Sequence, residues 1–432
     1  MTSPRTDNPQ QIAVIGTGYV GLVTAAGFAE LGNEVWCVDI DADKIDRLNR
    51  GEIPIYEPGL AECVARNTDR LHFSTELAPA LEHARLLFVA VGTPPTYSGD
   101  ADLSAVNAVV DAMPATDRHA LVMKSTVPVG TGATIKREFA RQGKGFAYVS
   151  CPEFLKEGAA LEDFLEPDRV VVGDDGDWAG QAVCDLYAPL GAPLVRTDVP
   201  SAEMVKLASN AFLATKISFI NEIANVCEET GADVAEVARG MGLDRRIGGH
   251  FLRPGIGFGG SCFPKDVSAL KQLAGNSGYH FQLLTAVIEV NELQKRRVIS
   301  KLQKHLGSLV GRHVALLGLA FKAETDDMRE ASSLVLAARL QADGASVSAY
   351  DPVATDEARK LMRGVDFHAD PLSAADGADA VILVTEWSEF ASLDWQAVRE
   401  RMTGTLLVDG RNFADRDAVR VAGLVYEGIG RS

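Results

Sequence analysis

The feature that most constrains the fold is a glycine-rich turn between two apolar runs near the start of the chain. Residues 12–15 are apolar, the sequence GTGYVG follows, and residues 22–31 have the composition of a helix that ends at Gly32. A second apolar run, Glu34–Val38, ends at Asp39. A strand, a G-x-G-x-x-G turn, a helix and a second strand form the first unit of a doubly wound α/β domain. We therefore expect the chain to open with such a domain.

The same turn predicts a dinucleotide site. Gly16 makes the tight turn, Gly18 leaves room for a pyrophosphate, and Gly21 lets helix and strand pack closely. Asp39 stands 23 residues after Gly16, where its carboxylate can accept hydrogen bonds from a ribose diol. Because this carboxylate would repel a 2′-phosphate, we expect NAD rather than NADP. A glycine triplet alone also fits a plain packing turn, but here strand, helix, strand and acid are all in register.

Length and composition limit the remaining possibilities. A chain of 432 residues is too long for one ordinary core and predicts two or three domains. The hydrophobic share of 47% is typical of a globular protein, and no apolar run is long enough for a membrane span. The first ten residues, MTSPRTDNPQ, lack a hydrophobic signal core and look like a short disordered tail. We therefore expect a cytoplasmic protein with no membrane partner.

Charge and cysteine usage exclude further classes. The net charge of -17 argues against a nucleic-acid partner, and an anionic ligand would need local cations or helix N-termini to hold it. The six cysteines are scattered without CxxC pairs or zinc spacings. We therefore expect reduced thiols and no metal site.

Polar residues follow the expected strands of the first domain, at the edge where such sheets bind ligands. Three further apolar runs are expected strands: residues 85–91, 119–124 and 146–150. Thr93 and Thr126 follow the first two and are candidate cofactor neighbours, although a hydroxyl there also suits a helix cap. Glu153 and Lys156 follow the third run, and we expect them to face the ligand crevice.

A long helix is expected in the middle of the chain. Residues 201–230 contain no glycine or proline and lie between Pro200 and Gly231. The segment is apolar around most of its circumference, which predicts a central spine shared with a second subunit. Lys206 and Asn210 lie four residues apart and so share one face. A buried lysine is rare unless paired or functional, and the alternative is that Lys206 extends to water.

The last third repeats the α/β plan without the glycine fingerprint. After a second helical stretch at residues 281–306, four apolar runs predict strands: residues 312–318, 346–350, 380–385 and 405–408. The first turn, GLAFK, lacks the glycine triplet, so we expect no second dinucleotide there. Phe321, Lys322 and Arg411 follow strands and would suit a single nucleotide, or are ordinary surface residues.

The predicted fold is α/β, with two Rossmann-like doubly wound domains joined by a long central helix. We expect an NAD-binding domain at residues 1–200 and a second Rossmann-like domain that binds a nucleotide at residues 301–432. Residues 201–300 would form a central helical region that mediates dimerisation and carries a cysteine loop.

The sequence GFGGSCFPKD in this central region places Cys262 among glycines, just before Lys265 and Asp266. A thiolate is a nucleophile, and cations such as Lys265 and Lys206 favour it. The glycines would let a substrate approach closely. The alternative is an inert cysteine in a tight turn.

A nucleophilic cysteine beside NAD implies a specific reaction. Loss of a hydride turns an alcohol into an aldehyde, and thiolate attack then gives a thiohemiacetal. Loss of a second hydride gives a thioester, which water releases as a carboxylate. A one-step alcohol dehydrogenase needs no such cysteine.

Several motifs carry a resemblance to a known family. GTGYVG, VGTPP, STVPVGT, PEFLKEG, EMVKLASNAFLATKISFINE, GFGGSCFPKD, F-K-(x)6-R-E and DGRN occur in the order found in the UDP-glucose 6-dehydrogenase family, between residues 11 and 428. The resemblance implies a homodimer that oxidises UDP-glucose to UDP-glucuronate in two NAD-dependent steps.

The resemblance also implies residue roles. Cys262 would form the thioester, and Lys206 and Asn210 would polarise the sugar oxygen and stabilise an oxyanion. Asp266, Glu153 and Thr126 would position the hydrolytic water and assist proton transfer, with the division between them left open.

Two sets of binding residues follow from the same resemblance. The NAD set is Gly16, Gly18, Tyr19, Val20, Gly21, Asp39, Lys44, Thr93, Thr126, Lys265 and Arg329. The UDP-sugar set is Glu153, Phe154, Leu155, Lys156, Lys206, Asn210, Arg246, Phe251, Leu252, Arg253, Gly257, Phe321, Lys322 and Arg411. In the family, the residue at the position of Arg246 comes from the neighbouring subunit. Arg253 stands where some relatives have lysine, which keeps the charge but changes its reach.

Three alternatives stay open at this point. The first is a dehydrogenase of the same family that acts on GDP-mannose or a UDP-N-acetylhexosamine. The second is a one-step hydroxyacid dehydrogenase, which would release one NADH per substrate. The third is an NAD-sensing module without turnover.

Overall fold

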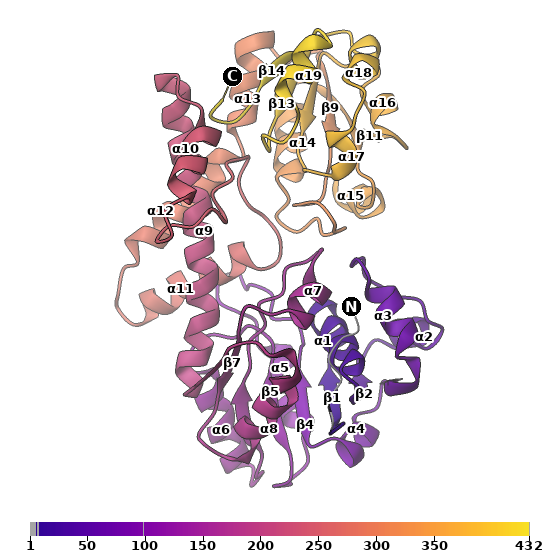
Figure 1. The fold of residues 1–432 in the computed structure, drawn as a ribbon, viewed down its shortest axis with the longest axis vertical. Coiled ribbons are helices and arrows are strands. Elements are labelled where there is room, and N and C mark those ends of the chain that lie inside the picture. Colours follow the sequence, from indigo (N-terminus) through magenta and orange to yellow (C-terminus); the bar gives the residue numbers. More distant parts are fainter. Residues whose placement is uncertain (1–5, 7, 98, 432) are drawn as a thin grey trace. The chain divides into compact units, whose positions relative to one another are not determined.

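The structure, a computed structural model, describes residue 6, residues 8–97 and residues 99–431. Residues 1–5 and 7 of the expected N-terminal tail lie outside the described residues. Two compact units divide the chain (Figure 1): one comprises residues up to 209 with 272–278, and the other residues 210–271 with 279–432. Each unit contains one mainly parallel sheet, and a long helix runs from the first unit into the second. The predicted α/β class with two Rossmann-like domains is confirmed.

In the described part of the first unit, the sheet has the order β3-β2-β1-β4-β5-β6-β7-β8. Its strands are β1 Gln11–Ile15, β2 Glu34–Val38, β3 Leu71–Ser74, β4 Leu86–Val89, β5 Ala120–Met123, β6 Ala147–Ser150, β7 Val170–Gly173 and β8 Leu194–Thr197. Neighbours pair in parallel except β6 and β7. The order reverses between β1 and β4, and doubly wound sheets bind ligands beyond the carboxyl ends of the strands at such a point.

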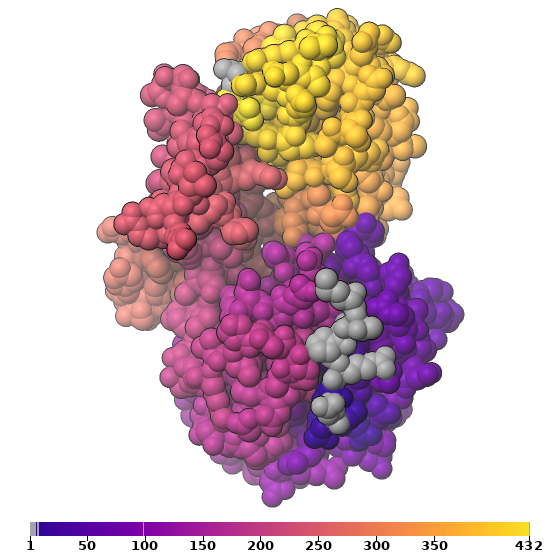
Figure 2. All heavy atoms as spheres, viewed as in Figure 1, coloured from indigo at the N-terminus to yellow at the C-terminus, as the bar shows by residue number. Residues whose placement is uncertain are grey.

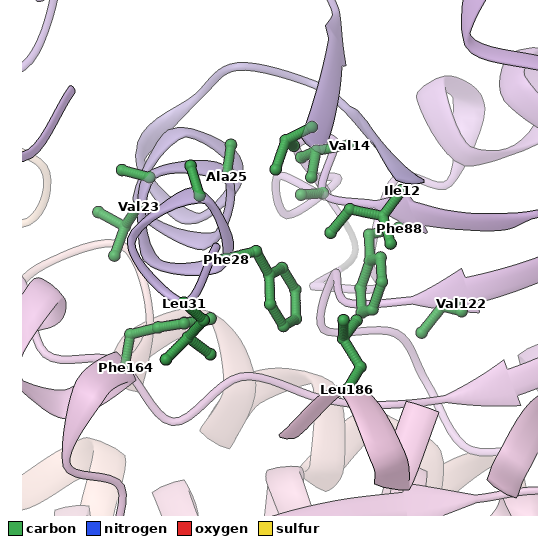
Figure 3. Close-up of a cluster of buried hydrophobic side chains, with 14 of the residues drawn as sticks. Ile12, Val14, Val23, Ala25, Phe28, Leu31, Phe88, Val122, Phe164 and Leu186 are labelled. Atoms are coloured by element: carbon green, nitrogen blue, oxygen red, sulfur yellow. The ribbon is translucent and has the colours of Figure 1, made fainter. Parts of the chain in front are cut away.

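Helices cover both faces of this sheet (Figure 1). They are α1 Tyr19–Glu30, α2 Ala42–Asn49, α3 Leu60–Arg66, α4 Leu77–His83, α5 Ser104–Ala112, α6 Thr131–Arg141, α7 Ala160–Leu165 and α8 Trp178–Tyr187, with 3-10 turns at Thr68–Arg70 and Ala188–Leu190. Helix α1 begins three residues before the sequence-based expectation of residue 22, because the chain enters the helix directly from Gly18. Figure 3 shows Phe28 of α1 directed toward Phe88 of β4, whose ring centroid is 5.1 Å away. This contact packs the C-terminal half of α1 against the sheet.

The sheet of the second unit has the order β11-β10-β9-β12-β13-β14 among its described residues. Its strands are β9 His313–Leu317, β10 Ser346–Tyr350, β11 Val365–Phe367, β12 Ala380–Leu383, β13 Leu406–Asp409 and β14 Val425–Glu427. Its helices are α14 Ser332–Ala342, α15 Thr355–Leu361, α16 Pro371–Ala374, α17 Ser388–Ala391, α18 Trp395–Arg401 and α19 Arg416–Val421. The atoms of this last domain, yellow in Figure 2, form a continuous convex surface on the face shown.

Five helices form the middle of the chain. They are α9 Val199–Thr230, α10 Val234–Gly242, α11 Phe263–Asn276, α12 Gln282–Gln294 and α13 Arg297–Leu306. Helix α9 begins at Val199 rather than after Pro200, because proline is tolerated in the first turn, where its missing N–H has no helical partner.

The helical stretch expected at residues 281–306 is present, and it is divided into α12 and α13. The helix is interrupted at Lys295 and Arg296. There the amide of Arg296 donates to the carbonyl of Leu293 instead of continuing the helical pattern. On helix α9, Phe212, Phe219 and Val226 are 65%, 49% and 57% exposed in the single chain. Among the described helices, none has the length and hydropathy that a membrane span requires.

Candidate active site

The glycine turn after β1 has the geometry that its sequence predicts. Gly16 has φ +95, and a Cβ on Gly21 would lie 1.8 Å from the carbonyl oxygen of Gly16. A Cβ on Gly18 would meet nothing within 4 Å, so the space above the N-terminus of α1 is open. Gly18 is also the N-cap of α1 and has no side chain to bond the first amides. The turn therefore fits a pyrophosphate held by backbone N–H groups.

Asp39 lies beside this turn, where a ribose diol would bind. Its Oδ2 accepts hydrogen bonds from the amide and hydroxyl of Thr17 at 2.7 and 2.8 Å, and Lys44 Nζ lies 3.0 Å away. Burial raises the pKa of Asp39, but hydrogen bonds from Thr17, Asp41 and Lys44 outweigh burial and hold the pKa below its ordinary value. The carboxylate is therefore charged at neutral pH, as discrimination against a 2′-phosphate requires. The sequence motif did not reveal the contribution of Thr17.

Thr93 and Thr126, predicted neighbours of the cofactor, lie together. The hydroxyl of Thr93 donates to the carbonyl of Thr126 at 2.9 Å, which joins the loops after β4 and β5. Tyr19 has a different setting: its hydroxyl bonds Glu57 and accepts the amide of Gly158 at 2.9 Å. Tyr19 thus ties α1 to the loop before α7.

Lys206 and Glu153 form a buried ion pair within the first unit. Lys206 Nζ lies 2.8 Å from Glu153 Oε1, and the side chains are 4% and 4% exposed. The alternative that Lys206 extends to water is therefore wrong. Burial raises the pKa of Glu153, but Lys206, the Leu155 amide and Lys124 outweigh it, so the pKa lies below its ordinary value. Glu153 is thus ionised at neutral pH.

The other predicted residues of the PEFLKEG motif lie around this pair. The guanidinium of Arg169 sits 3.5 Å from the ring centroid of Phe154, and Lys206 Nζ lies 5.4 Å from the same centroid. The Leu155 amide donates to Glu153 Oε2 at 2.6 Å. Lys156 is more exposed and pairs with Asp163 at 3.2 Å.

Asn210 and Asp266 are hydrogen-bonded within the second unit. Asn210 Nδ2 donates to Asp266 Oδ2 at 2.6 Å, and both residues are buried. Lys265 Nζ lies 3.1 Å from Asp266 Oδ1. Because Asn210 follows Lys206 by four residues on α9, one helix face carries an ammonium and an amide, each fixed by a carboxylate.

Cys262 stands at the N-terminus of α11. Its carbonyl accepts the amide of Asp266 at 2.8 Å, which makes it the residue that opens the helix. The hydroxyl of Ser261 lies 3.5 Å from the sulfur. The five other cysteines are buried, whereas Cys262 is partly exposed. A helix N-terminus stabilises a negatively charged sulfur, so the position suits a nucleophile.

The glycines before Cys262 have a physical role that the sequence did not indicate. A Cβ on Gly259 would lie 2.2 Å from the carbonyl oxygen of Glu330, and one on Gly260 would lie 2.8 Å from the Phe321 ring. Gly257 and Gly260 also have φ +88 and +83. These glycines therefore allow the loop to pack against its own chain, whereas the sequence argument assigned them to substrate approach.

Arg411, Gly257 and Phe321, predicted sugar-nucleotide residues, are brought together. Arg411 donates from Nε to the Val384 carbonyl at 2.8 Å, from Nη1 to that of Gly257 at 3.0 Å, and from Nη2 to that of Phe321 at 3.1 Å. The ammonium of Lys322 lies 5.5 Å from the ring centroid of Phe321. Arg411 thus joins the cysteine loop to strand ends of the second sheet.

The second sheet differs from the first at the site where a ribose would bind. Asp351 follows β10, as Asp39 follows β2, but it is 3% exposed. Its Oδ2 accepts the amides of Leu319 and Ala320 and the indole N–H of Trp387, at 2.6, 3.1 and 3.1 Å. Because the carboxylate is used inside the protein, this turn does not repeat the dinucleotide site.

The other predicted residues of the second unit are spread more widely. Arg246 is 89% exposed in its side chain and pairs with Asp244 at 2.7 Å. Arg329 pairs with Asp327 at 2.7 Å, while its carbonyl accepts the amide of Gly260 at 2.8 Å. Three further residues of the predicted UDP-sugar set follow one another in the chain. Phe251 is partly buried, Leu252 is buried and Arg253 is exposed.

Lys124 is a buried residue that the sequence reasoning missed. It is 5% exposed, and its Nζ lies 3.0 Å from the hydroxyl of Tyr187 and 3.9 Å from the sulfur of Cys151. A lysine directly after a buried strand was the available signal. Lys124 is a second cation that favours the charged form of Glu153.

Comparison with known proteins identifies the family. The profile of the UDP-glucose/GDP-mannose dehydrogenase family matches in three parts: the NAD binding domain at residues 10–191, the central domain at 200–293 and the UDP binding domain at 315–416. The chain belongs to this family. It is an NAD-dependent dehydrogenase, and the predicted cofactor is confirmed.

Individual relatives cover nearly the whole chain. UDP-glucose 6-dehydrogenase of Pseudomonas aeruginosa is 48% identical, over 98% of this chain and 97% of its own. UDP-glucose 6-dehydrogenase TuaD of Bacillus subtilis is 46% identical, over 98% and 93%. The solved UDP-glucose dehydrogenase of Pyrobaculum islandicum has a TM-score of 0.92 at 40% identity and covers 99% of both chains.

Proposed function

We propose that the chain oxidises UDP-glucose to UDP-glucuronate in two NAD-dependent steps at one site, with Cys262 as the covalent nucleophile. The observation that carries the proposal is that Cys262 is the partly exposed cysteine and opens a helix that also carries Asp266, the carboxylate bonded to Asn210. The similarity to UDP-glucose dehydrogenases over the whole chain supports the substrate. A one-step hydroxyacid dehydrogenase would have no use for such a cysteine.

In the first step, the sugar C6 hydroxyl loses a proton and a hydride and becomes an aldehyde. When bound, NAD accepts the hydride lost in each oxidation. Glu153 is the group assigned to take up the proton, because its carboxylate lies 2.8 Å from the ammonium of Lys206, which is proposed to bind the sugar oxygen. Lys206 and Asn210 would stabilise negative charge on the sugar oxygen.

In the second step, the Cys262 sulfur adds to the aldehyde carbon and gives a thiohemiacetal. Loss of a second hydride from that carbon produces a thioester. Water then attacks, the carbon–sulfur bond breaks, and the thiolate and a carboxylate are released. Asp266, beside Cys262 in the chain and hydrogen-bonded to Asn210, is suited to orient this water. In total one alcohol and one water yield one carboxylate, two hydrides and three protons.

The binding sets given above follow from this proposal. Gly16, Gly18, Gly21 and Asp39 would hold NAD, since the open N-terminus of α1 and the charged Asp39 fit its pyrophosphate and ribose. Gly257, Phe321, Lys322 and Arg411 would hold the sugar nucleotide. Hydrogen bonds between Arg411 and the other segments support this second set.

We also propose a homodimer that acts in the cytoplasm, with the three-part division at residues 1–200, 201–300 and 301–432. Phe212, Phe219 and Val226 recur every seven residues on α9 and are all exposed, as an interface helix would require. Arg246, exposed beside Asp244, is in a position to serve the neighbouring subunit.

The rival within the family is a dehydrogenase of GDP-mannose or a UDP-N-acetylhexosamine. Initial rates of NADH formation on the three sugar nucleotides separate these possibilities. We expect kcat/KM for UDP-glucose to exceed the other two, because the whole-chain relatives that we compared act on UDP-glucose. Faster turnover of GDP-mannose would refute the substrate assignment, and no turnover of any of the three would favour a sensing module.

A further inference from the structure

Residues 255–258, which precede Cys262, form no helix or strand, yet their backbone is almost fully hydrogen-bonded. Asn291 of α12 holds the end of this segment with two hydrogen bonds to Phe258. Its Oδ1 accepts the amide of Phe258 at 2.8 Å, and its Nδ2 donates to the carbonyl of the same residue at 3.0 Å. Asn291 is 4% exposed. One side chain thus supplies the donor and acceptor that a neighbouring strand would provide.

Two more buried amides hold Gly255. Its N–H donates to Asn221 Oδ1 at 2.9 Å, and its carbonyl accepts from Gln294 Nε2 at 2.9 Å. Asn221 and Gln294 are 0% and 1% exposed. We name Asn221, Asn291 and Gln294 the amide clasp. Its members come from α9 and α12, two helices that both lie outside the loop.

The residues between these anchors are bonded as well. Ile256 donates to the carbonyl of Gly410 at 3.1 Å and accepts from the hydroxyl of Ser332 at 3.1 Å. The carbonyl of Gly257 accepts from Arg411 at 3.0 Å. A buried backbone group without a partner is costly, so the segment is held in one arrangement.

The amide clasp also explains a glycine. Gly257 has φ +88, and a Cβ there would lie 2.9 Å from Asn291 Oδ1. A side chain at this position would push Asn291 away from Phe258. Three residues separate Phe258 from Cys262, so the direction in which the chain leaves Phe258 sets the place where Cys262 begins α11.

We propose that the amide clasp positions Cys262 for the second oxidation, with Asn291 as its central positioning residue. This inference rests on the proposed function. The three side chains of the amide clasp bond the backbone of residues 255–258, and none of them is assigned a contact with substrate or NAD. A shift of about 1 Å in a reacting group lowers turnover by roughly a hundredfold, so a loosened loop would impair the thiol-dependent step.

The test uses Asn291→Asp, which keeps the shape but removes the donor to the Phe258 carbonyl. Asn33→Asp is the matched control in the first unit, because Asn33 is also buried and bonds one amide and one carbonyl, those of Gln10 and Phe28. Ser332→Ala is a milder variant, for use if Asn291→Asp does not fold. It removes the hydrogen bond from the Ser332 hydroxyl to the carbonyl of Ile256.

Two measurements are made on each purified full-length variant: amide hydrogen exchange in residues 255–262, and NADH formed per UDP-glucose consumed. For Asn291→Asp we expect exchange about tenfold faster in this segment and a ratio clearly below two, with the aldehyde trappable by hydroxylamine. Ser332→Ala should change both values in the same direction, and less. Asn33→Asp should leave both unchanged. A smaller folded fraction would lower kcat but not this ratio.

Unchanged exchange in residues 255–262 of Asn291→Asp, or a ratio that stays at two, would overturn the proposal. A ratio of NADH to UDP-glucose that falls below two in Asn33→Asp as well would also overturn the proposal, because the effect would then be general destabilisation. A wild-type ratio of one would instead contradict the proposed function, and the exchange measurement would still decide whether Asn291 holds the loop.

Discussion

A buried charged side chain needs a charged partner close by, and the ion pair of Lys206 and Glu153 is the clearest case. The sequence placed Lys206 on a buried face but gave no partner, because 53 residues separate it from Glu153 and the contact exists only after folding. The same holds for Asn210 and Asp266, which are 56 residues apart. Sequence reasoning therefore supplied the candidate groups, and the structure supplied the pairing.

Glu153→Gln should destabilise the protein by roughly 3–5 kcal/mol, because a buried ammonium loses its carboxylate. The folded pKa of Glu153 is depressed from the ordinary 4.5, so its contribution to stability is present above that pH and is lost as the pH falls through the folded pKa. Urea unfolding of wild type and variant at pH 7 and pH 4 checks this: the difference should shrink at the lower pH.

The control for Glu153→Gln is Asp175→Asn, which removes an exposed partner of Lys136. Exposed pairs contribute about 0–1 kcal/mol, so its effect should be small at both pH values. Equal effects of the two substitutions would contradict the importance of burial.

The proposed preference for NAD over NADP also rests on one residue, Asp39. Asp39→Asn should raise the ratio of kcat/KM for NADP to that for NAD by roughly tenfold or more, because a charge that repels a 2′-phosphate is removed. Asp43→Asn removes an exposed carboxylate nearby and should leave the ratio unchanged. Steady-state rates with both coenzymes decide the question, and an unaltered ratio in Asp39→Asn would refute the assigned role.

Among the elements, strands were predicted best. The run at residues 346–350 matches β10, and those at 119–124 and 380–385 extend only one or two residues beyond β5 and β12. Apolar runs covered on both faces give this clear signal. The end of α12 was missed because residues 295 and 296 are a lysine and an arginine, which carry no helix-breaking signal.

The cysteine loop gives a prediction about glycine. Gly260 and Gly423 both have φ +83, but only a Cβ on Gly260 would meet a ring, that of Phe321. Gly423→Ala should cost about 1–2 kcal/mol from backbone strain alone. Gly260→Ala should cost about 1–3 kcal/mol more and abolish most activity, because the loop must move. Thermal unfolding and turnover of both variants test this, and equal losses would contradict the packing role.

At the scale of the whole molecule, the exposed residues Phe212, Phe219 and Val226 form a stripe on α9 that predicts a homodimer interface. Phe219→Glu should convert a homodimer into monomers, because a charge would be buried in the proposed interface. Leu361→Glu is the control, since Leu361 is 57% exposed on α15, away from the stripe. Light scattering coupled to gel filtration gives the mass. A dimer that survives Phe219→Glu would place the interface elsewhere.

The proposed reaction as a whole depends on one sulfur, that of Cys262, which would carry the sugar between two oxidations. The most direct measurement is mass spectrometry of the Cys262 peptide after rapid acid quenching during turnover of UDP-glucose and NAD. We predict a UDP-glucuronyl adduct on Cys262 that decays as UDP-glucuronate forms, accumulates in Asp266→Asn, and is absent with NAD or sugar nucleotide alone. Formation of UDP-glucuronate at an undiminished rate by Cys262→Ala would contradict the account.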